Sequence, residues 1–186
     1  MPLFKPKPPD VSELKSKGSV KGLVRALSYP WDGAVCRAAA RALPDFQNCS
    51  EFSDQGVVEE LAGAMMLDPE IRSAAAEALA SLGSSCSHPE AREALLEAVQ
   101  SPDQELRAAV CEAIGKKGKP DFVEPLAAIG SPAAVDALLG LLDPSRAGQE
   151  TVDSVVAALG ELAVGAPDQQ AREKARQALV VLAPDS

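Results

Sequence analysis

Few side chains in this sequence suit acid–base or nucleophilic catalysis. The single histidine, His88, stands directly before Pro89 and is therefore expected in a loop. Cys86 lies two residues before it and could be imagined as a thiolate beside its base, but we do not expect that pair to act. The sequence contains no GxSxG, no HExxH, no Walker loop and no GxGxxG after a strand. It thus predicts no catalytic site, no bound metal ion and no cofactor.

Composition favours helices over a sheet. Aromatic residues make up only 3% of the chain, and Ala, Leu and Val carry the apolar content. No stretch approaches the roughly 18 apolar residues of a membrane helix. The start, MPLFKPKPP, also lacks the apolar run of a signal peptide. We therefore expect no membrane insertion and a cytoplasmic location.

Charge is distributed unevenly along the chain. The net charge is −9, yet residues 1–41 carry eight Lys or Arg against three Asp or Glu, and residues 42–186 carry ten against twenty-four. Because affinity for nucleic acid comes mainly from cations that face phosphates, the acidic body argues against a nucleic-acid partner. A basic partner fits better, although the acidic excess can also serve solubility alone.

A nine-residue segment recurs along the chain. VCRAAARAL at 35–43 returns as IRSAAAEAL at 71–79 and as LRAAVCEAI at 106–114, with spacings of 36 and 35 residues. A weaker copy, TVDSVVAAL at 151–159, follows after 45 residues. Each copy places apolar residues at helical spacing, and periods in this range are typical of stacked helical hairpins. The sequence predicts an all-α fold, a short right-handed α-solenoid of about four hairpins with terminal capping helices.

Ahead of each copy lies a second amphipathic stretch, the expected first helix of its hairpin. The longer gap before the last copy predicts an irregular short unit at 117–130, with a stubby helix over about 121–129 that interrupts regular stacking. A single domain over 10–186 is expected between a flexible tail at 1–9 and a capping helix at 168–182. Its repeats are expected at about 20–46, 55–83, 89–116 and 131–164.

Proline and glycine punctuate the predicted helices. Gly83, Gly115 and Gly130 follow apolar runs, and we expect them to take the left-handed conformation that ends a helix. Proline stands at five places where a helix should begin, namely Pro69, Pro89, Pro102, Pro132 and Pro144.

The four cysteines lack CxxC spacing and are expected to be reduced thiols: Cys36, Cys49, Cys86 and Cys111. Cys49 and Cys86 occupy matching loops of successive repeats. Equivalent atoms of adjacent repeats usually lie about 10 Å apart, from helix packing distances, which is beyond disulfide reach. We expect these two thiols to be exposed and unpaired. Cys111 replaces a small residue of the earlier copies and is expected to be packed.

The segment DPEIRSAAAEALASLG at 68–83 resembles the HEAT-like repeats known as phycobilisome-lyase HEAT-like, whose second helix typically reads like VRRAAAEALG after a loop ending Asp-Pro-Glu. The resemblance covers most of residues 20–164. It implies stacked HEAT-like hairpins, in which an Arg beside the first apolar residue commonly pairs with a loop carboxylate. Here that residue is Arg72 or Arg107, and Cys36 and Val152 replace it in the outer copies.

The polar side of each second helix is expected to line the inner surface of the stack. By equivalent position this surface holds the pairs Arg37 and Arg41, Ser73 and Glu77, Ala108 and Glu112, and Asp153 and Ala157. Its charge runs from basic to acidic and could orient an extended peptide or a helix, or the residues could simply be solvated. The loop SYPWDG adds Tyr29 and Trp31, which either anchor a partner or cover the end of the core.

These features predict a non-catalytic protein–protein interaction module, a scaffold or adaptor that binds a peptide or protein along the inner helix surface. The resemblance supplies the main alternative, an accessory subunit of a bilin-lyase-like or other modifying enzyme complex, because such repeats serve as lyase subunits as well as adaptors. A nucleic-acid-binding array is a further alternative, but it requires a basic inner groove, and only the first repeat offers one.

Overall fold

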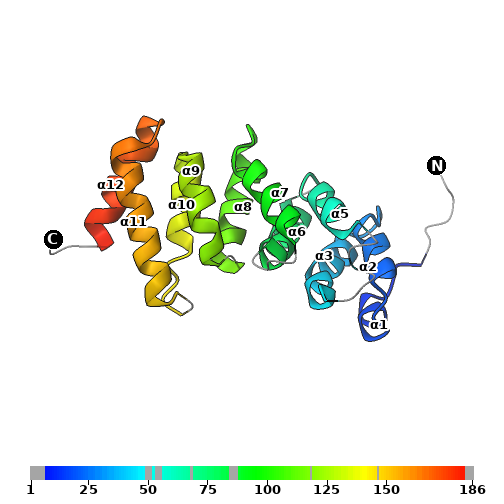
Figure 1. Ribbon diagram of the computed structural model, residues 1–186. Helices are drawn as coiled ribbons and strands as arrows, with labels where there is room; N and C mark the ends of the chain where they lie inside the picture. Colours follow the sequence, from blue (N-terminus) through cyan, green and yellow to red (C-terminus); the bar gives the residue numbers. More distant parts are fainter. Residues whose placement is uncertain are drawn as a thin grey trace.

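The computed structural model describes residues 7–48, 52, 56–67, 69–83, 88–117, 119–145 and 147–182, so most of the expected tail lies outside it. Within these ranges the chain forms helices and no strand. The helices stand in one elongated row, in which the first and last described helices, Val11–Ser16 and Gln169–Leu182, lie at opposite ends (Figure 1). The expected all-α fold, a short α-solenoid, is confirmed. Among the described helices, none is long and apolar enough to cross a membrane.

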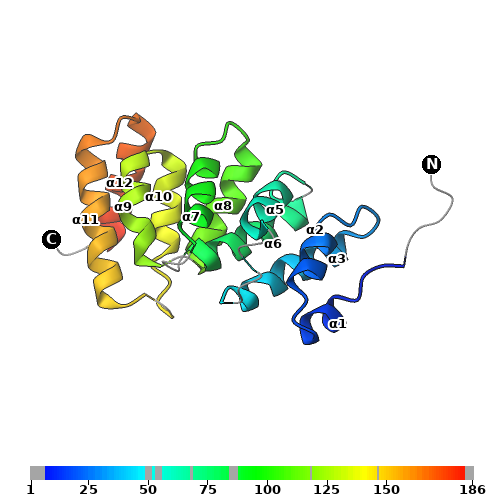
Figure 2. The same ribbon diagram turned by 45° about the vertical axis from the view of Figure 1, so that its right-hand side comes forward.

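The helices form two layers, because each hairpin gives its first helix to one layer and its second helix to the other. Figure 2 shows the same row turned, with α1 (Val11–Ser16) at one end. One short 3-10 helix, Leu43–Phe46, follows the helix Gly33–Ala42, and another, Pro120–Phe122, precedes the helix Val123–Ile129. The first helices are α2 (Val20–Leu27), α5 (Val57–Ala64), α7 (Pro89–Val99), α9 (Val123–Ile129) and α11 (Gln149–Gly165). The second helices are α3 (Gly33–Ala42), α6 (Pro69–Gly83), α8 (Gln104–Lys117), α10 (Pro132–Gly140) and α12 (Gln169–Leu182).

The second helices pack closely against one another, α3 on α6, α6 on α8 and α8 on α10. Small residues permit this approach. A Cβ atom added to Gly115 of α8 would lie 2.9 Å from the Cα atom of Gly140 on α10, which no real side chain tolerates. The first helices α2, α5 and α7 contact one another much less. Close packing of the stack therefore depends mainly on the second-helix layer.

The expectation that residues 131–164 form one hairpin is wrong. α10 packs against α8 and α9 and contacts α11 only slightly, so α10 is the second helix of a hairpin that begins with α9. α11 pairs with α12 and lies beside α9 in the first-helix layer. The stubby helix expected over 121–129 exists as α9, and it packs against α10 and α11.

A two-residue turn explains this pairing. Gly130 has a φ of 59°, so it ends α9 in the left-handed region as expected. The hydroxyl oxygen of Ser131 then accepts the N–H of Ala134 at 3.2 Å and starts α10 at once. Helices joined by so short a turn become antiparallel neighbours. The connection from α10 to α11 is longer and leaves α11 free to join the other layer.

Proline marks a helix start at three of the five expected places, Pro69, Pro89 and Pro132. α8 begins only at Gln104, because the carboxylate of Asp103 accepts the N–H of Glu105 at 2.9 Å and sets the helix start there. α11 begins at Gln149, after a turn that includes Pro144. At the start of α8 the Asp103 cap therefore overrides the local proline signal.

Candidate protein-binding surface

Three successive second helices present the predicted residues at matching positions, on a surface that we call the second-helix face. In each helix the pair lies four and eight residues after the first helical residue: Arg37 and Arg41 on α3, Ser73 and Glu77 on α6, and Ala108 and Glu112 on α8. Arg41, Ala108 and Glu112 are exposed, and the other three are half-buried. The sequence pattern thus predicted three residue pairs that neighbour one another on this face, and we call these three pairs the ladder.

The fourth predicted pair lies elsewhere. Asp153 and Ala157 belong to α11, which stands in the first-helix layer, and so they do not extend the second-helix face. Asp136 and Gly140 hold the equivalent positions on α10, four and eight residues after Pro132. The error follows directly from pairing α11 with α10, since that pairing puts the wrong helix in the second-helix layer.

Lysines neutralise the acidic part of this face. The Nζ atom of Lys116 lies 2.6 Å from a carboxylate oxygen of Glu112 and 3.4 Å from one of Glu77. The hydrogen bond to Glu112 raises the pKa of Lys116 above its ordinary value. On the next helices, the Nζ atom of Lys174 lies 2.6 Å from the Asp136 carboxylate. The face is therefore a row of ion pairs beyond α3, and neither lysine is among the site residues predicted from the sequence.

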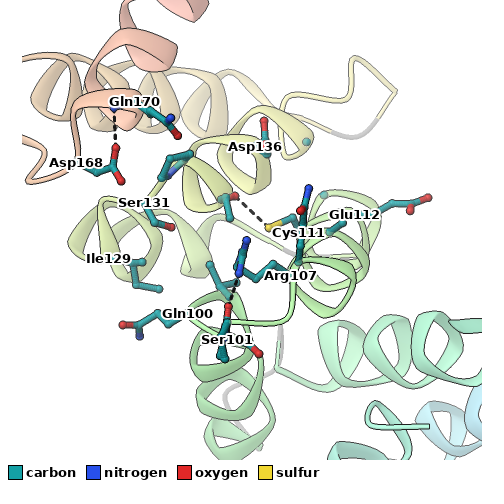
Figure 3. Close-up of a pocket in the computed structure, with 18 of the residues that line it drawn as sticks. Gln100, Ser101, Arg107, Cys111, Glu112, Ile129, Ser131, Asp136, Asp168 and Gln170 are labelled. Carbon is teal, nitrogen blue, oxygen red and sulfur yellow. Dashed lines mark hydrogen bonds between the residues drawn. The ribbon is translucent and has the colours of Figure 1, made fainter. Parts of the chain in front are cut away.

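A groove of about 1070 Å³ opens on this face between α8, α10 and the start of α12. Its lining includes the small residues Ala108, Ala133 and Gly140 and the acidic residues Glu112 and Asp136. Figure 3 shows further polar side chains around it, from the loop before α8 and from the start of α12: Gln100, Ser101, Asp168 and Gln170. The groove thus combines small lining residues with several hydrogen-bonding groups.

Two polar side chains in the groove wall are used by the fold. The guanidinium of Arg107 donates to the carbonyl oxygen of Ser101 at 2.6 Å, and the thiol of Cys111 donates to the carbonyl oxygen of Ala133 at 3.0 Å (Figure 3). Cys111 is buried, as expected for a packed thiol. Burial, followed by the nearby Asp136 carboxylate, raises its pKa to about 11. Cys111 is therefore a poor nucleophile at neutral pH.

Arginine ties the loop inside a hairpin to the second helix in three places. The Nε atom of Arg72 donates to the carbonyl oxygen of Met65 at 3.0 Å, and its Nη1 atom lies 3.3 Å from Glu105. Arg107 and Arg172 bond in the same way to carbonyl groups of their own loops. In α3 the thiol of Cys36 replaces the arginine and donates to the carbonyl oxygen of Tyr29 at 3.2 Å. These interactions satisfy carbonyl groups at helix ends, which is a structural role. Of the expected carboxylate pairings, Arg72 lies 3.7 Å from Asp103 and 3.3 Å from Glu105.

The aromatic pair lies at the turn of the first hairpin. The ring centroids of Tyr29 and Trp31 are 5.5 Å apart, Tyr29 packs against the core, and Trp31 is 41% exposed. Tyr29 also lines a cavity of about 540 Å³ together with Leu67. Tyr29 therefore closes the end of the core, while Trp31 stays available for a contact.

His88 is buried and held by contacts that suit a structural side chain. Its Nε2 atom lies 3.2 Å from the carbonyl oxygen of Gln47, its Nδ1 atom lies 3.5 Å from Glu90, and its ring packs on Phe52 at 5.0 Å between centroids. Cys49 and Cys86 fall outside the described residues. Within the described part, no group of three or more His, Cys, Asp or Glu side chains is arranged to hold a metal ion.

Comparisons with known proteins agree with a stack of helical repeats. A family model for HEAT repeats matches residues 66–151, from the end of the second hairpin's first helix to the start of α11. No curated protein matches the sequence. The match is to HEAT repeats in general, and the finer resemblance to phycobilisome-lyase repeats stays a prediction.

Two solved structures are similar to this chain. One is an engineered protein from the Northeast Structural Genomics Consortium, with 22% identity, a TM-score of 0.46, and coverage of 91% of this chain and 81% of that one. The other is a designed armadillo repeat protein in complex with the peptide (KR)4, with 16% identity, a TM-score of 0.45, and coverage of 91% and 84%. The family match supports a HEAT-like repeat protein.

Proposed function

We propose that the chain is a protein-binding module that holds a peptide or a helix of its partner on the second-helix face. HEAT- and armadillo-like repeats generally mediate protein–protein interaction, and repeat solenoids are typically non-catalytic scaffolds. The observation that carries the proposal is the groove of about 1070 Å³ between α8, α10 and α12, because it lies on the face predicted from the sequence and includes Ala108 and Glu112.

The groove suits a polypeptide. Small residues in its lining let a main chain or a helix approach closely, and the lining also supplies both donors and acceptors from Gln100, Gln104 and Asp136. Its ion pairs mix the two signs of charge, so a partner gains by placing opposite charges in register with them. Arg37 and Arg41 extend the face with positive charge at the α3 end.

A steric block tests the proposal. The full chain captures its partner from a cell extract, the partner is purified, and its dissociation constant is measured for wild type and for Ala108→Trp. Because Ala108 is exposed and lines the groove, the indole fills the groove without entering the core. We expect binding to weaken by about 30-fold, the effect of losing a central contact region.

The matched control is Val164→Trp, which puts the same indole at an 83% exposed position near the end of α11, outside this groove. We expect this variant to bind its partner like wild type. Unchanged binding by a folded Ala108→Trp protein contradicts the proposal, and so does an equal loss in both variants.

A further inference from the structure

The two layers of the stack carry opposite charge. The five second helices hold nine Lys or Arg against six Asp or Glu. Four of the first helices, α5, α7, α9 and α11, hold one Arg against nine acidic residues, all of them exposed. These nine residues, which we call the acidic face, are Glu59, Glu60, Glu90, Glu93, Glu97, Glu124, Glu150, Asp153 and Glu161. The remaining first helix, α2, adds Lys21 and Arg25, so the negative charge of this layer is concentrated on α5, α7, α9 and α11.

Within the described ranges, the carboxylates of the acidic face lack Lys or Arg partners. In the part of the chain that the structure describes, none of the nine carboxylates forms an ion pair with Lys or Arg, and Glu90 faces only His88. Three acidic residues of the second helices, in contrast, lie beside Lys116 or Lys174. Unpaired like charges on one side sum to a negative potential that attracts cations.

An apolar groove of about 650 Å³ runs through this face between α9 and α11. Its walls are formed mainly by small and apolar residues, among them Ala127 and Ala128 on α9 and Ala157 on α11. One carboxylate stands on each wall, Glu124 on α9 and Glu161 on α11, and both side chains are exposed. The groove thus offers a hydrocarbon surface flanked by two anions.

We infer that this α9–α11 groove is a second docking site, which binds a Lys- or Arg-rich segment of another protein. A long basic side chain matches both properties of the groove, because its methylene stem covers apolar surface while its cation reaches a carboxylate. The surrounding acidic face steers such a segment toward the groove. The same charge repels nucleic-acid phosphates and anionic lipids, so the occupant is a cationic polypeptide.

This site is independent of the second-helix face. With one partner in each groove, the two grooves would make the chain an adaptor between two proteins. Ala108→Trp blocks only the groove of the second-helix face, so a failure of one proposal is distinguishable from a failure of the other.

The test is the affinity of the full chain for a fluorescent peptide of about 12 residues that alternates Lys and Ala, measured by anisotropy at low salt. Glu124→Gln with Glu161→Gln removes both carboxylates of the groove and keeps the side-chain size. We expect affinity to fall at least about 10-fold, as for loss of a charge-assisted hydrogen bond. Ala128→Trp, which fills the groove without changing charge, is expected to cause a similar loss.

The matched control is Glu93→Gln with Glu97→Gln, which removes the same two charges from α7 outside the groove. We expect this control to change affinity by about twofold or less, since only the long-range field is altered. Equal losses in the two double variants overturn the proposal, because the peptide then senses net charge alone. Unchanged binding by Glu124→Gln with Glu161→Gln overturns it too, as does loss of peptide binding in Ala108→Trp.

Discussion

The first and second helices of this stack have similar amphipathic sequences, but they differ in their packing contacts and in their surface charge. Second helices are joined by close glycine and alanine contacts, by arginines that bond to loop carbonyls and by ion pairs across neighbouring repeats. First helices such as α5 and α11 contain glycines, Gly63 and Gly160, at which an added Cβ meets nothing within 4 Å. The second-helix layer therefore holds the stack together, and the first-helix layer is freer to carry unpaired charge.

Substitution of glycine should show the largest difference in the free energy of unfolding between the two layers. Gly115→Val inserts a side chain where the Gly140 backbone already lies 2.9 Å from the Cβ position. We expect the free energy of unfolding to fall by about 3 kcal/mol, as for severe overpacking. Gly160→Ala in α11 meets no neighbour and should raise it by about 0.5 kcal/mol through helix propensity. Urea denaturation measures both, and equal effects would remove the contrast.

Substitution of arginine should show the next largest difference in stability loss between the two layers. The guanidinium of Arg72, whose side chain is 11% exposed, bonds to the carbonyl oxygens of Met65 and Leu67. Arg72→Ala leaves these acceptors without their donor, so we expect a loss of about 2 kcal/mol. Arg92→Ala, at the one arginine of α5, α7, α9 and α11, should cost about 0.5 kcal/mol or less. A comparable loss at Arg92 would show that the layers do not differ in this respect.

Cys111 adds a pH dependence to the second-helix layer. Its pKa is raised to about 11 from the ordinary 9.0, so its stabilising contribution is complete below about pH 9 and is lost as pH rises toward 11. We expect a loss on the order of 1 kcal/mol across that window, measured as the difference between wild type and Cys111→Ala. Identical pH profiles for the two proteins would rule out this contribution.

Surface ion pairs should give the smallest effect. The side chains of Lys174 and Asp136 are 38% and 50% exposed, and water screens such pairs. Lys174→Met should therefore lower the free energy of unfolding by about 0.5 kcal/mol. Thermal melts of Lys174→Met, Asp136→Asn and the double variant measure the coupling. A coupling above about 2 kcal/mol would contradict the small stabilisation expected of an exposed ion pair.

The helical hairpins were predictable because their signals are local. The copies at 35–43, 71–79 and 106–114 each contain enough apolar periodicity to define a second helix, and α3, α6 and α8 occupy these segments. The copy at 151–159 has the same periodicity but lies in a first helix. Periodicity marks an amphipathic helix in either layer. The layer is decided by turn length and tertiary packing, in this case by Gly130 and Ser131.

The glycines and the ion pairs also show that local sequence signals do not predict contacts made by tertiary packing. Gly83 and Gly115 follow apolar runs, as helix-ending glycines do, yet both are helical, and the expected left-handed conformation is wrong for them. Each lies against a neighbouring backbone, which leaves no room for a side chain. The pair Glu112 and Lys116 has the i, i+4 spacing and could have been found from the sequence. Asp136 and Lys174 lie 38 residues apart and meet only through the stacking of α10 and α12. Sequence patterns gave the positions of the ladder on α3, α6 and α8 but not its charge balance.

Amide chemical-shift mapping by NMR with the captured partner tests the central claim most directly. The account predicts that partner binding perturbs amides on the second-helix face, with the largest shifts at Ala108, Glu112 and Asp136 around the groove. Shifts that leave α8 and α10 unchanged would contradict recognition through this face.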